Sequence, residues 1–289
     1  MSKLNVINLL RPHQYLKNFF IFLPLFFAIK ITSAELLLNA FIAFIAFSLT
    51  ASAIYIVNDY YDVEEDKKHP KKKNRPLASG VISKSQSIII MLILLLTGFT
   101  LMTLLSLKAV AFLFGYTIMN IAYSFYLKRV AILDIVMISI GFVLRLFIGS
   151  SVTGIPLSLW IVIMTFLLAL FLALAKRRDD VLIFLDTGKK MRKVIDVYNL
   201  KFLDISIVIM AFIVIITYIF YTRSIEVMAR ANSEYLYLTS LFVIFGIMRY
   251  LKIVFVNKDS GSPTKVILKD WLIQITLLGW FISFAWILY

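Results

Sequence analysis

Cysteine is absent from the 289 residues of the chain, and histidine occurs only twice. The absence of cysteine excludes disulfide bonds, thiolate metal centres and a cysteine nucleophile. Because His13 and His69 are the only imidazoles, a metal site in this chain must rely on oxygen ligands. Acidic residues are scarce as well: 16 aspartates and glutamates stand against 30 lysines and arginines, so the formal net charge is +14.

Charged residues of either sign make up only 16% of the sequence, whereas hydrophobic residues make up 61%. The mean hydropathy is +0.92. Soluble domains contain roughly 45 to 50% apolar residues, so this chain has more apolar surface than a soluble fold can bury. Most of the uncharged stretches approach the ~20 residues that cross a bilayer as a helix. These stretches are residues 36–58, 88–105, 109–127, 146–175, 205–222 and 271–289.

We therefore expect an all-α polytopic membrane protein with about nine transmembrane helices, bundled as one domain over residues 1–289. The first expected span is short, contains Pro24 and follows a segment, residues 3–17, that suits an amphipathic helix in the membrane interface. Gly154 and Pro156 predict a tight turn between the fifth and sixth spans. The expected spans are residues 18–31, 35–57, 86–105, 109–127, 133–152, 157–175, 204–222, 235–256 and 269–289.

The positions of the basic residues predict the orientation of these spans. All but five of the 30 lysines and arginines would lie on the side that holds the N-terminus. Because basic residues favour cytoplasmic loops, we expect the N-terminus and the two long charged loops, residues 60–85 and 176–203, on the cytoplasmic side of the cell (inner) membrane. This placement accounts for the net charge without a nucleic acid partner. The five exceptions are Arg145 within a span and, on the opposite side, Lys30, Lys108, Arg223 and Arg230.

An acidic motif closes the second expected span. At 100° per residue, Asp59, Asp62 and Asp66 fall within about 60° of one another on a helix, and Asn58 widens the arc to about 100°. Clustered oxygen ligands of this kind suit Mg²⁺, which binds through one or two carboxylates together with substrate phosphate oxygens. The alternative is a solvated membrane exit, but carboxylates at a helix C-terminus oppose the helix dipole and need a positive partner.

A cationic run follows the acidic motif, from Lys67 to Arg75. Lysines in such a run can simply hold anionic lipid headgroups. Arg75 stands between Asn74 and Pro76, and its guanidinium fork suits bidentate binding of a phosphate. We therefore predict that Asp59, Asp62 and Asp66 bind a metal ion and that Arg75 joins them in a catalytic site for a diphosphate.

These residues carry a family resemblance. The chain resembles the UbiA superfamily of intramembrane prenyltransferases, and its opening closely resembles the decaprenyl-phosphate phosphoribosyltransferase branch of that superfamily. The first resemblance rests on Asn58-Asp59-x-x-Asp62-x-x-x-Asp66 with Arg75-Pro76-Leu77 and Ser79-Gly80, and the second on Arg11-Pro12-His13-Gln14-Tyr15-x-Lys17-Asn18 with Pro24-Leu25-Phe26. Further matches are Tyr123-Ser124-x-x-Leu127-Lys128, Lys176-Arg177-Arg178, Ser262-Pro263-Thr264 and Lys269-Asp270.

The resemblance implies nine transmembrane helices around a cavity that is capped on the cytoplasmic side. It also implies Mg²⁺-dependent transfer of 5-phosphoribose from phosphoribosyl diphosphate (PRPP) to a polyprenyl phosphate. Prenyl-transferring members carry a second acidic motif after the sixth span, where this chain has Lys176, Arg177 and Arg178. Those cations suit a site with additional phosphate groups, although they also fit ordinary markers of a cytoplasmic span end.

Further residues are candidates for substrate binding. Arg145 lies deep in the fifth span, where a charge is expensive enough to suggest a function, although it could also cap backbone carbonyls of a neighbouring helix. Lys17 and Asn18 lie at headgroup depth before the first span, and Tyr123 precedes Lys128 by one and a half helical turns. Each has a structural alternative, such as the interfacial belt for Tyr123. The complete substrate-binding set is Lys17, Asn18, Asn58, Tyr123, Lys128, Arg145, Lys176, Arg177 and Arg178.

Two other functions remain open from the sequence. A prenyl diphosphate transferase acting on an aromatic, quinone or haem acceptor would share the first motif and the metal. A transporter would carry carboxylates within its spans or a repeated pair of broken helices, and the sequence shows neither pattern clearly. The expected partners are therefore PRPP, a polyprenyl phosphate and the membrane, and the sequence indicates no oligomeric state.

Overall fold

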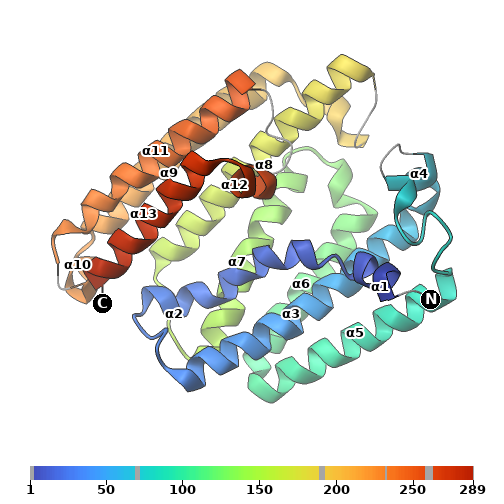
Figure 1. Cartoon of the computed structure of the whole chain (residues 1–289), viewed down its shortest axis with the longest axis horizontal. Coiled ribbons are helices and arrows are strands. Elements are labelled where there is room, and N and C mark those ends of the chain that lie inside the picture. Colours follow the sequence, from blue (N-terminus) through green and yellow to red (C-terminus); the bar gives the residue numbers. More distant parts are fainter. Residues whose placement is uncertain (1–2, 69–71, 189–192, 232, 258–262, 289) are drawn as a thin grey trace. The chain divides into compact units, whose positions relative to one another are not determined.

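The structure is a computed structural model that describes residues 3–68, 72–188, 193–231, 233–257 and 263–288. All regular secondary structure in those ranges is helical (Figure 1), which confirms the all-α prediction. The chain divides into two compact units, residues 1–128 with 140–157, and residues 129–139 with 158–289. The helix α7 (Leu133–Thr153) contributes to both.

The remaining elements fall to one unit or the other, apart from η3 (Leu127–Arg129) at the boundary. The first unit contains α1 (Lys3–Leu10), η1 (Pro12–Phe22), α2 (Leu23–Phe27), α3 (Ala34–Tyr61), α4 (Val63–Lys68), η2 (Lys72–Asn74), α5 (Lys84–Leu105) and α6 (Leu107–Phe125). The second contains α8 (Leu159–Thr187), η4 (Lys193–Val197), α9 (Leu200–Arg223), α10 (Ile225–Ala231), η5 (Tyr235–Thr239), α11 (Ser240–Lys252), η6 (Ile253–Asn257), α12 (Pro263–Lys269) and α13 (Trp271–Leu288).

Seven helices in the described ranges are long and apolar enough to cross a membrane. They are α3, α5, α6, α7, α8, α9 and the continuous stretch Tyr235–Asn257, and each overlaps an expected span. A shorter apolar helix, Trp271–Ile287, overlaps the last expected span. The multi-pass architecture is therefore confirmed, whereas the count of nine spans is not.

The first expected span, residues 18–31, does not form one α-helix. Residues Pro12–Phe22 form a 3₁₀-helix, and α2 adds five α-helical residues. A proline in the first turn of each helix lacks the backbone N–H that an interior position would need. Because a 3₁₀-helix rises about 2.0 Å per residue and an α-helix about 1.5 Å, the two together extend roughly 30 Å.

Local sequence signals explain where several helices begin and end. The hydroxyl of Ser83 accepts a hydrogen bond from the Gln86 backbone N–H, and the Gln86 side chain accepts one from the Ser83 N–H, which starts α5. Ser158 caps α8 with its hydroxyl, which accepts a hydrogen bond from the Ile161 N–H. Gly188 ends α8 with a φ of 67°, a left-handed conformation that glycine adopts without steric cost.

Small residues allow close helix packing in the first unit. A Cβ added to Gly98 of α5 would collide with Thr50 and with the Ala46 carbonyl of α3. Gly149 of α7 lies in the same way against the Ile21 backbone of η1. Close backbone approach of this kind is typical of packing inside a membrane, where burial of apolar surface gives no driving force between helices. It places η1 firmly beside α7.

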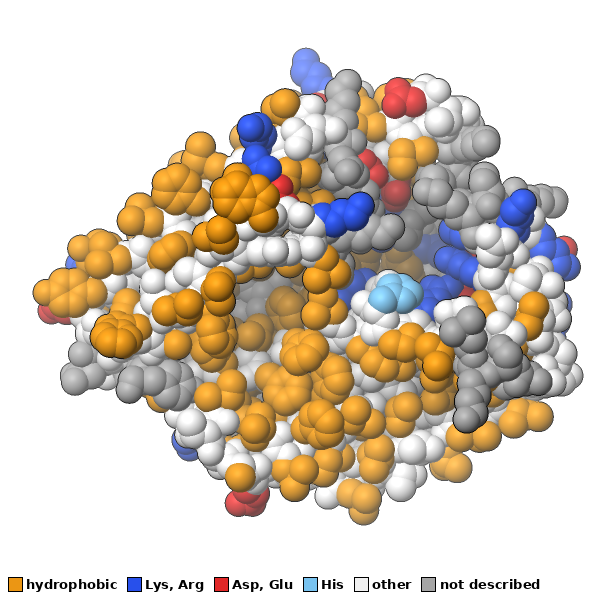
Figure 2. All heavy atoms as spheres, viewed as in Figure 1, with side chains coloured by type: hydrophobic (Ala, Val, Ile, Leu, Met, Phe, Trp, Pro, Cys, Tyr) orange, Lys and Arg blue, Asp and Glu red, His pale blue; other side chains and the backbone are white. Residues whose placement is uncertain are grey.

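Apolar side chains take up much of the face of the molecule that Figure 2 shows. On α5, Ile89, Leu92, Ile93 and Leu96 are each more than half exposed. A large exposed apolar surface indicates contact with lipid or protein, and here it lies on helices of spanning length.

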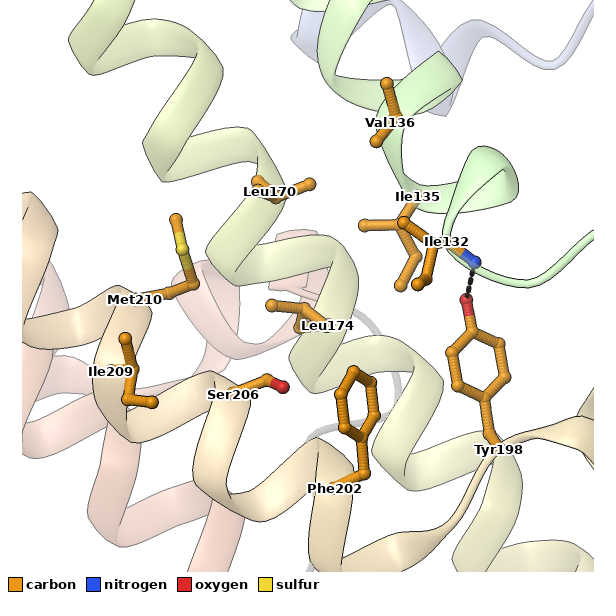
Figure 3. Close-up of a pocket in the computed structure, with 10 residues that line it drawn as sticks. All are labelled: Ile132, Ile135, Val136, Leu170, Leu174, Tyr198, Phe202, Ser206, Ile209 and Met210. Carbon is orange, nitrogen blue, oxygen red and sulfur yellow. Dashed lines mark hydrogen bonds between the residues drawn. The ribbon is translucent and has the colours of Figure 1, made fainter.

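The second unit is built on α8 and α9, with Phe171, Leu203 and Ile207 buried between neighbouring helices. It contains a cavity of about 250 Å³ between the start of α7, α8 and α9 (Figure 3). Its lining is apolar except for Ser206 and Tyr198, and the Tyr198 hydroxyl accepts a hydrogen bond from the Ile132 N–H. The cavity therefore suits hydrocarbon better than water, which needs several polar partners.

Candidate active site

Two of the three motif aspartates converge on one arginine. The carboxylate of Asp59 lies 2.9 Å and that of Asp66 lies 2.5 Å from Nη1 of Arg75. The helical hydrogen bonds continue across the junction of α3 and α4, from the Asp62 N–H to Asn58 and from the Asp66 N–H to Asp62. This continuity keeps Asp59 and Asp66 on one face, as the spacing predicts. Both side chains are buried, with 2% and 3% of their surface exposed.

The third aspartate takes a separate partner. Lys128 donates to both carboxylate oxygens of Asp62, at 2.9 and 3.0 Å, and lies 3.5 Å from the Asn58 side-chain oxygen. Asp62 is the C-cap residue that follows α3, and its backbone, with φ −91° and ψ 5°, departs from helical geometry. Within the described ranges no three acidic or histidine side chains lie close enough to hold a metal ion.

Arg11 is a member of this cluster that the sequence reasoning did not assign to the site. Its Nη2 lies 2.5 and 2.6 Å from the two carboxylate oxygens of Asp59, and its guanidinium lies 5.3 Å from the centre of the Tyr55 ring. The Arg11 backbone adopts a φ of 54°, which is uncommon for a residue with a Cβ. The pairing spans 48 positions, so only the presence of Arg11 in the family-like opening could have indicated it.

Four cations surround the three motif aspartates. Lys72 lies 3.8 Å from Asp66, at the edge of the salt-bridge range. Three carboxylates, of Asp59, Asp62 and Asp66, are thus paired with four cations, of Arg11, Lys72, Arg75 and Lys128. Buried carboxylates at a helix C-terminus require such compensation. Two arginines and two lysines gathered at one site favour an anionic ligand.

The donor set also fits a magnesium ion. The carboxylates of Asp59 and Asp66 already converge on Nη1 of Arg75. Asn58 and Asp62 add side-chain oxygens within one helical turn of Asp59 along the chain. Mg²⁺ takes one or two carboxylates and completes its shell with water and phosphate oxygens, so two converging carboxylates are sufficient. The guanidinium groups now beside them are the groups that a phosphate ligand would attract.

Arg145 lies in a second polar group in the first unit. Its Nε donates to the Asn18 side-chain oxygen at 2.9 Å, and its Nη1 donates to the Gly141 carbonyl at 2.6 Å. Asn18 in turn donates to the Ser48 hydroxyl at 2.9 Å. The carbonyl that Arg145 caps therefore belongs to its own helix α7 and not to a neighbouring helix, and Arg145 also contacts another predicted residue, Asn18.

Lys17 and Tyr123 are two further predicted substrate-binding residues of this unit. Lys17 donates to the Gln14 side chain at 2.6 Å. Tyr123 lies half-buried on α6, before Lys128. Both stay predictions as substrate-binding residues.

The basic residues Lys176, Arg177 and Arg178 lie within α8 and not in a loop, because α8 continues to Thr187. Arg177 is completely buried, with its Nε 2.9 Å from Asp134 and its Nη1 2.6 Å from Asp180. Arg178 donates to Asp204 at 2.6 Å and to the Val254 carbonyl at 2.8 Å.

Tyr198 completes this group in the second unit. Its hydroxyl donates to Asp134 at 2.6 Å. Burial, and then the hydrogen bond to Asp134, raise the pKa of Tyr198 well above its ordinary value of 10.0, so the hydroxyl stays protonated. Asp134 therefore links the start of α7 to both Arg177 and Tyr198. These contacts hold α8 against the start of α7 and the segment that contains Tyr198.

Comparison with known proteins gives a consistent family. The sequence model of the UbiA prenyltransferase family matches residues 19–273. A decaprenyl-phosphate phosphoribosyltransferase of Corynebacterium glutamicum is 30% identical over 95% of this chain and 84% of the relative. The protein of the same name from Mycobacterium tuberculosis is 29% identical over 95% of this chain and 91% of the relative.

Solved structures share the fold. A UbiA homolog from Archaeoglobus fulgidus, bound to DMAPP and Mg²⁺, superposes with a TM-score of 0.71 at 20% identity, over 97% of both chains. The same homolog bound to GPP and Mg²⁺ gives a TM-score of 0.72 at 20% identity, over 98% of both chains. At this identity the likeness establishes the architecture and nothing finer.

Proposed function

The chain belongs to the UbiA prenyltransferase family and is a membrane-embedded transferase, and from this premise we propose that it transfers 5-phosphoribose from PRPP to a polyprenyl phosphate and releases diphosphate. The similarity over 95% of the chain to relatives named decaprenyl-phosphate phosphoribosyltransferase carries this proposal. The four cations around Asp59, Asp62 and Asp66 support it, because both substrates carry phosphate groups.

In this proposal the aspartates and the arginines divide the work of holding the diphosphate. Asp59, Asp62 and Asp66 would bind Mg²⁺, which when bound neutralises negative charge on the leaving group. Arg75 and Arg11 already lie against the carboxylates, and their guanidinium forks suit diphosphate oxygens. Fixed cations at the leaving group stabilise the charge that develops there.

The transfer step needs no strong general base. The acceptor phosphate is already an anion, so one of its oxygens attacks the anomeric carbon of PRPP while the bond from that carbon to the diphosphate breaks. The role of the protein is then to hold the two reacting atoms together, which by itself supplies a large part of the rate. Lys128, beside Asn58 and Asp62, is suitably placed for this positioning role, and Lys17 and Tyr123 are further candidates.

The remaining assignments belong to the same proposal. The N-terminus and the site face the cytoplasm, and residues 1–289 act as one UbiA-like domain. Lys176, Arg177 and Arg178 add positive charge on the same side. The buried ion pairs of Arg177 and Arg178 favour an indirect contribution from these two, through the position of α8.

A paired substrate assay tests the proposal. The purified full-length chain would be incubated with ribose-labelled PRPP and decaprenyl phosphate, and separately with labelled geranyl diphosphate and 4-hydroxybenzoate. We expect label in the lipid fraction and released diphosphate only with the first pair, loss of both in EDTA, and recovery with Mg²⁺. Transfer with the second pair alone would establish a prenyl diphosphate transferase instead.

A further inference from the structure

The buried and half-buried arginines of the described chain fall into two classes. Five of them contact a carboxylate, and Arg145 is the exception among those that the structure describes. The five arginines and their partners are Arg11 with Asp59, Arg75 with Asp59 and Asp66, Arg177 with Asp134 and Asp180, Arg178 with Asp204, and Arg249 with Asp270.

Arg145 is also placed where an unpaired charge is most costly. It lies within the spanning helix α7, with 5% of its surface exposed. Its surroundings are neutral: the Gly141 carbonyl, the Asn18 amide, and the faces of Phe47 and Tyr116 at 4.6 and 5.2 Å from the guanidinium carbon. Aromatic faces and neutral acceptors offset part of the cost, but a buried cation in a membrane is normally matched by an anion.

The side chain is held in a fixed orientation. Asn18 accepts from Nε of Arg145 and donates to the Ser48 hydroxyl, so both ends of its amide are engaged. Ser48 lies on α3, and Asn18 lies on η1, which packs against α7 at Gly149. Only Nη2 is weakly engaged, because its contact with the Tyr116 hydroxyl is 3.4 Å, beyond the usual 2.7–3.2 Å of an N–H···O bond.

We propose that Arg145, oriented by Asn18 and Ser48, forms a second anion subsite that binds a phosphomonoester through Nη2. The missing counter-ion of Arg145 is then a substrate phosphate. The subsite rests on the proposed function, because PRPP carries a 5-phosphate besides the diphosphate that the aspartate cluster takes, and a polyprenyl phosphate carries a phosphomonoester of its own.

The two anion sites lie along the same helix. Ser48 and Asp59 are 11 residues apart on α3, which corresponds to about 16 Å along the helix axis. The long side chains of Arg145 and Arg11 reduce that separation, since the guanidinium of Arg11 already lies over Tyr55, one turn before Asp59. The first unit therefore offers one cationic group at the membrane surface and a second deeper in the bilayer.

Ligand-dependent thermal unfolding of the full-length chain in detergent tests the subsite without turnover. Ribose 5-phosphate and farnesyl phosphate serve as probes, since each carries a single phosphomonoester from one of the two substrate classes. We expect one probe to stabilise the wild-type protein and Arg145→Gln to weaken its apparent affinity by at least about tenfold, the value of one lost charge-assisted hydrogen bond. The probe that loses affinity identifies the source of the phosphate.

Two further variants keep the result decisive. Arg145→Lys retains the charge but loses the fork, and Ser48→Ala releases Asn18; both should weaken the same probe if Arg145→Gln does not fold. Diphosphate with Mg²⁺ should stabilise every variant as it stabilises the wild type. A merely structural Arg145 would lower the melting temperature without ligand and leave the probe affinities unchanged, and this outcome would overturn the proposal. Failure of the proposed function would appear separately, as no turnover of PRPP by the wild type.

Discussion

The three motif aspartates differ in how strongly the protein depends on each. Asp59 has 2% of its side chain exposed and pairs with two arginines, so its loss would leave two cations around a neutral group. Breaking a buried pair in this way typically costs about 3–5 kcal/mol. Asp62 is 22% exposed and pairs with Lys128 alone. Asp62 is therefore the better residue for separating activity from folding.

We predict that Asp62→Asn lowers turnover on the order of 100-fold or more while the protein still folds, because the variant removes one of the three charges that we propose to bind the metal. Initial rates with PRPP and a polyprenyl phosphate, together with the melting temperature, provide the measurement. Glu64→Gln is a matched control in the same acidic segment, since the Glu64 side chain is 73% exposed and pairs with Lys67 at the surface. Equal rates for both variants would remove Asp62 from the site.

Arg11 provides a second test at the residue scale. Arg11→Gln should destabilise the magnesium-free protein by about 1.5–3 kcal/mol, because Asp59 loses charge-assisted hydrogen bonds in a buried setting. Thermal unfolding in EDTA measures the effect. Lys67→Gln removes an exposed ion pair with Glu64 and should change stability little. A melting temperature that Arg11→Gln leaves unchanged would mean that Asp59 does not depend on this partner.

At the scale of helices, the contact between η1 and α7 sets the position of Asn18. Gly149→Ala would drive a methyl group into the Ile21 backbone, whereas Gly115→Ala in α6 would meet no atom within 4 Å. We expect the first variant to lose about 1–3 kcal/mol of stability through overpacking and the second to be neutral or slightly stabilised. Melting temperatures of the pair provide the comparison, and equal values would show that η1 yields without cost.

Asp270 links α11 to the start of α13. Hydrogen bonds from Arg249 hold the pKa of Asp270 below its ordinary value of 3.8, and its carboxylate also accepts from the Ile273 N–H at 3.0 Å. A depressed carboxyl pKa contributes stability that is present above the ordinary pKa and is lost as the pH falls through the pKa of the folded state. Stability should therefore decline between about pH 5 and pH 3.

The Asp270→Asn variant isolates this contribution. It retains a cap for α13 but removes the charge that faces Arg249. We predict a lower melting temperature than wild type at pH 7 and a smaller difference between the two proteins at pH 3.5. A constant difference across that range would contradict the assigned role of the carboxylate charge.

Sequence patterns located most helices closely, and their failures have physical causes. The expected spans 35–57 and 133–152 correspond to Ala34–Tyr61 and Leu133–Thr153, because long uncharged runs between charged ends define them. The α8 helix continues 12 residues beyond its expected end at residue 175. Hydropathy ends at Lys176, but lysine and arginine are good helix formers, and Arg177 pairs with Asp180 one turn later.

For the candidate site too, some contacts could be predicted from the sequence and others could not. Helical spacing correctly brought Asp59 and Asp66 together, whereas the cap geometry of Asp62 turned that residue toward Lys128. No local pattern could connect Arg11 with Asp59, because their pairing depends on how α1 and η1 pack against α3. Residues close in sequence were thus predictable, and long-range partners were not.

At the scale of the whole molecule, the distribution of basic residues predicts which side of the membrane each loop occupies. Because the chain contains no cysteine, single cysteines can be introduced and labelled one at a time. Lys73 lies in the charged segment after α4, and Lys108 lies at the start of α6. Both are exposed lysines, so they form a matched pair for labelling.

We predict that Lys108→Cys reacts with a membrane-impermeant maleimide added to intact cells or spheroplasts, and that Lys73→Cys reacts only after permeabilisation. Cytoplasmic loops retain basic residues during insertion, and the segment around Lys73 is one of the most basic in the chain. The reverse labelling pattern would place the aspartate cluster outside the cytoplasm. Since PRPP is a highly charged donor that cannot cross a bilayer unaided, that outcome would also count against the proposed reaction.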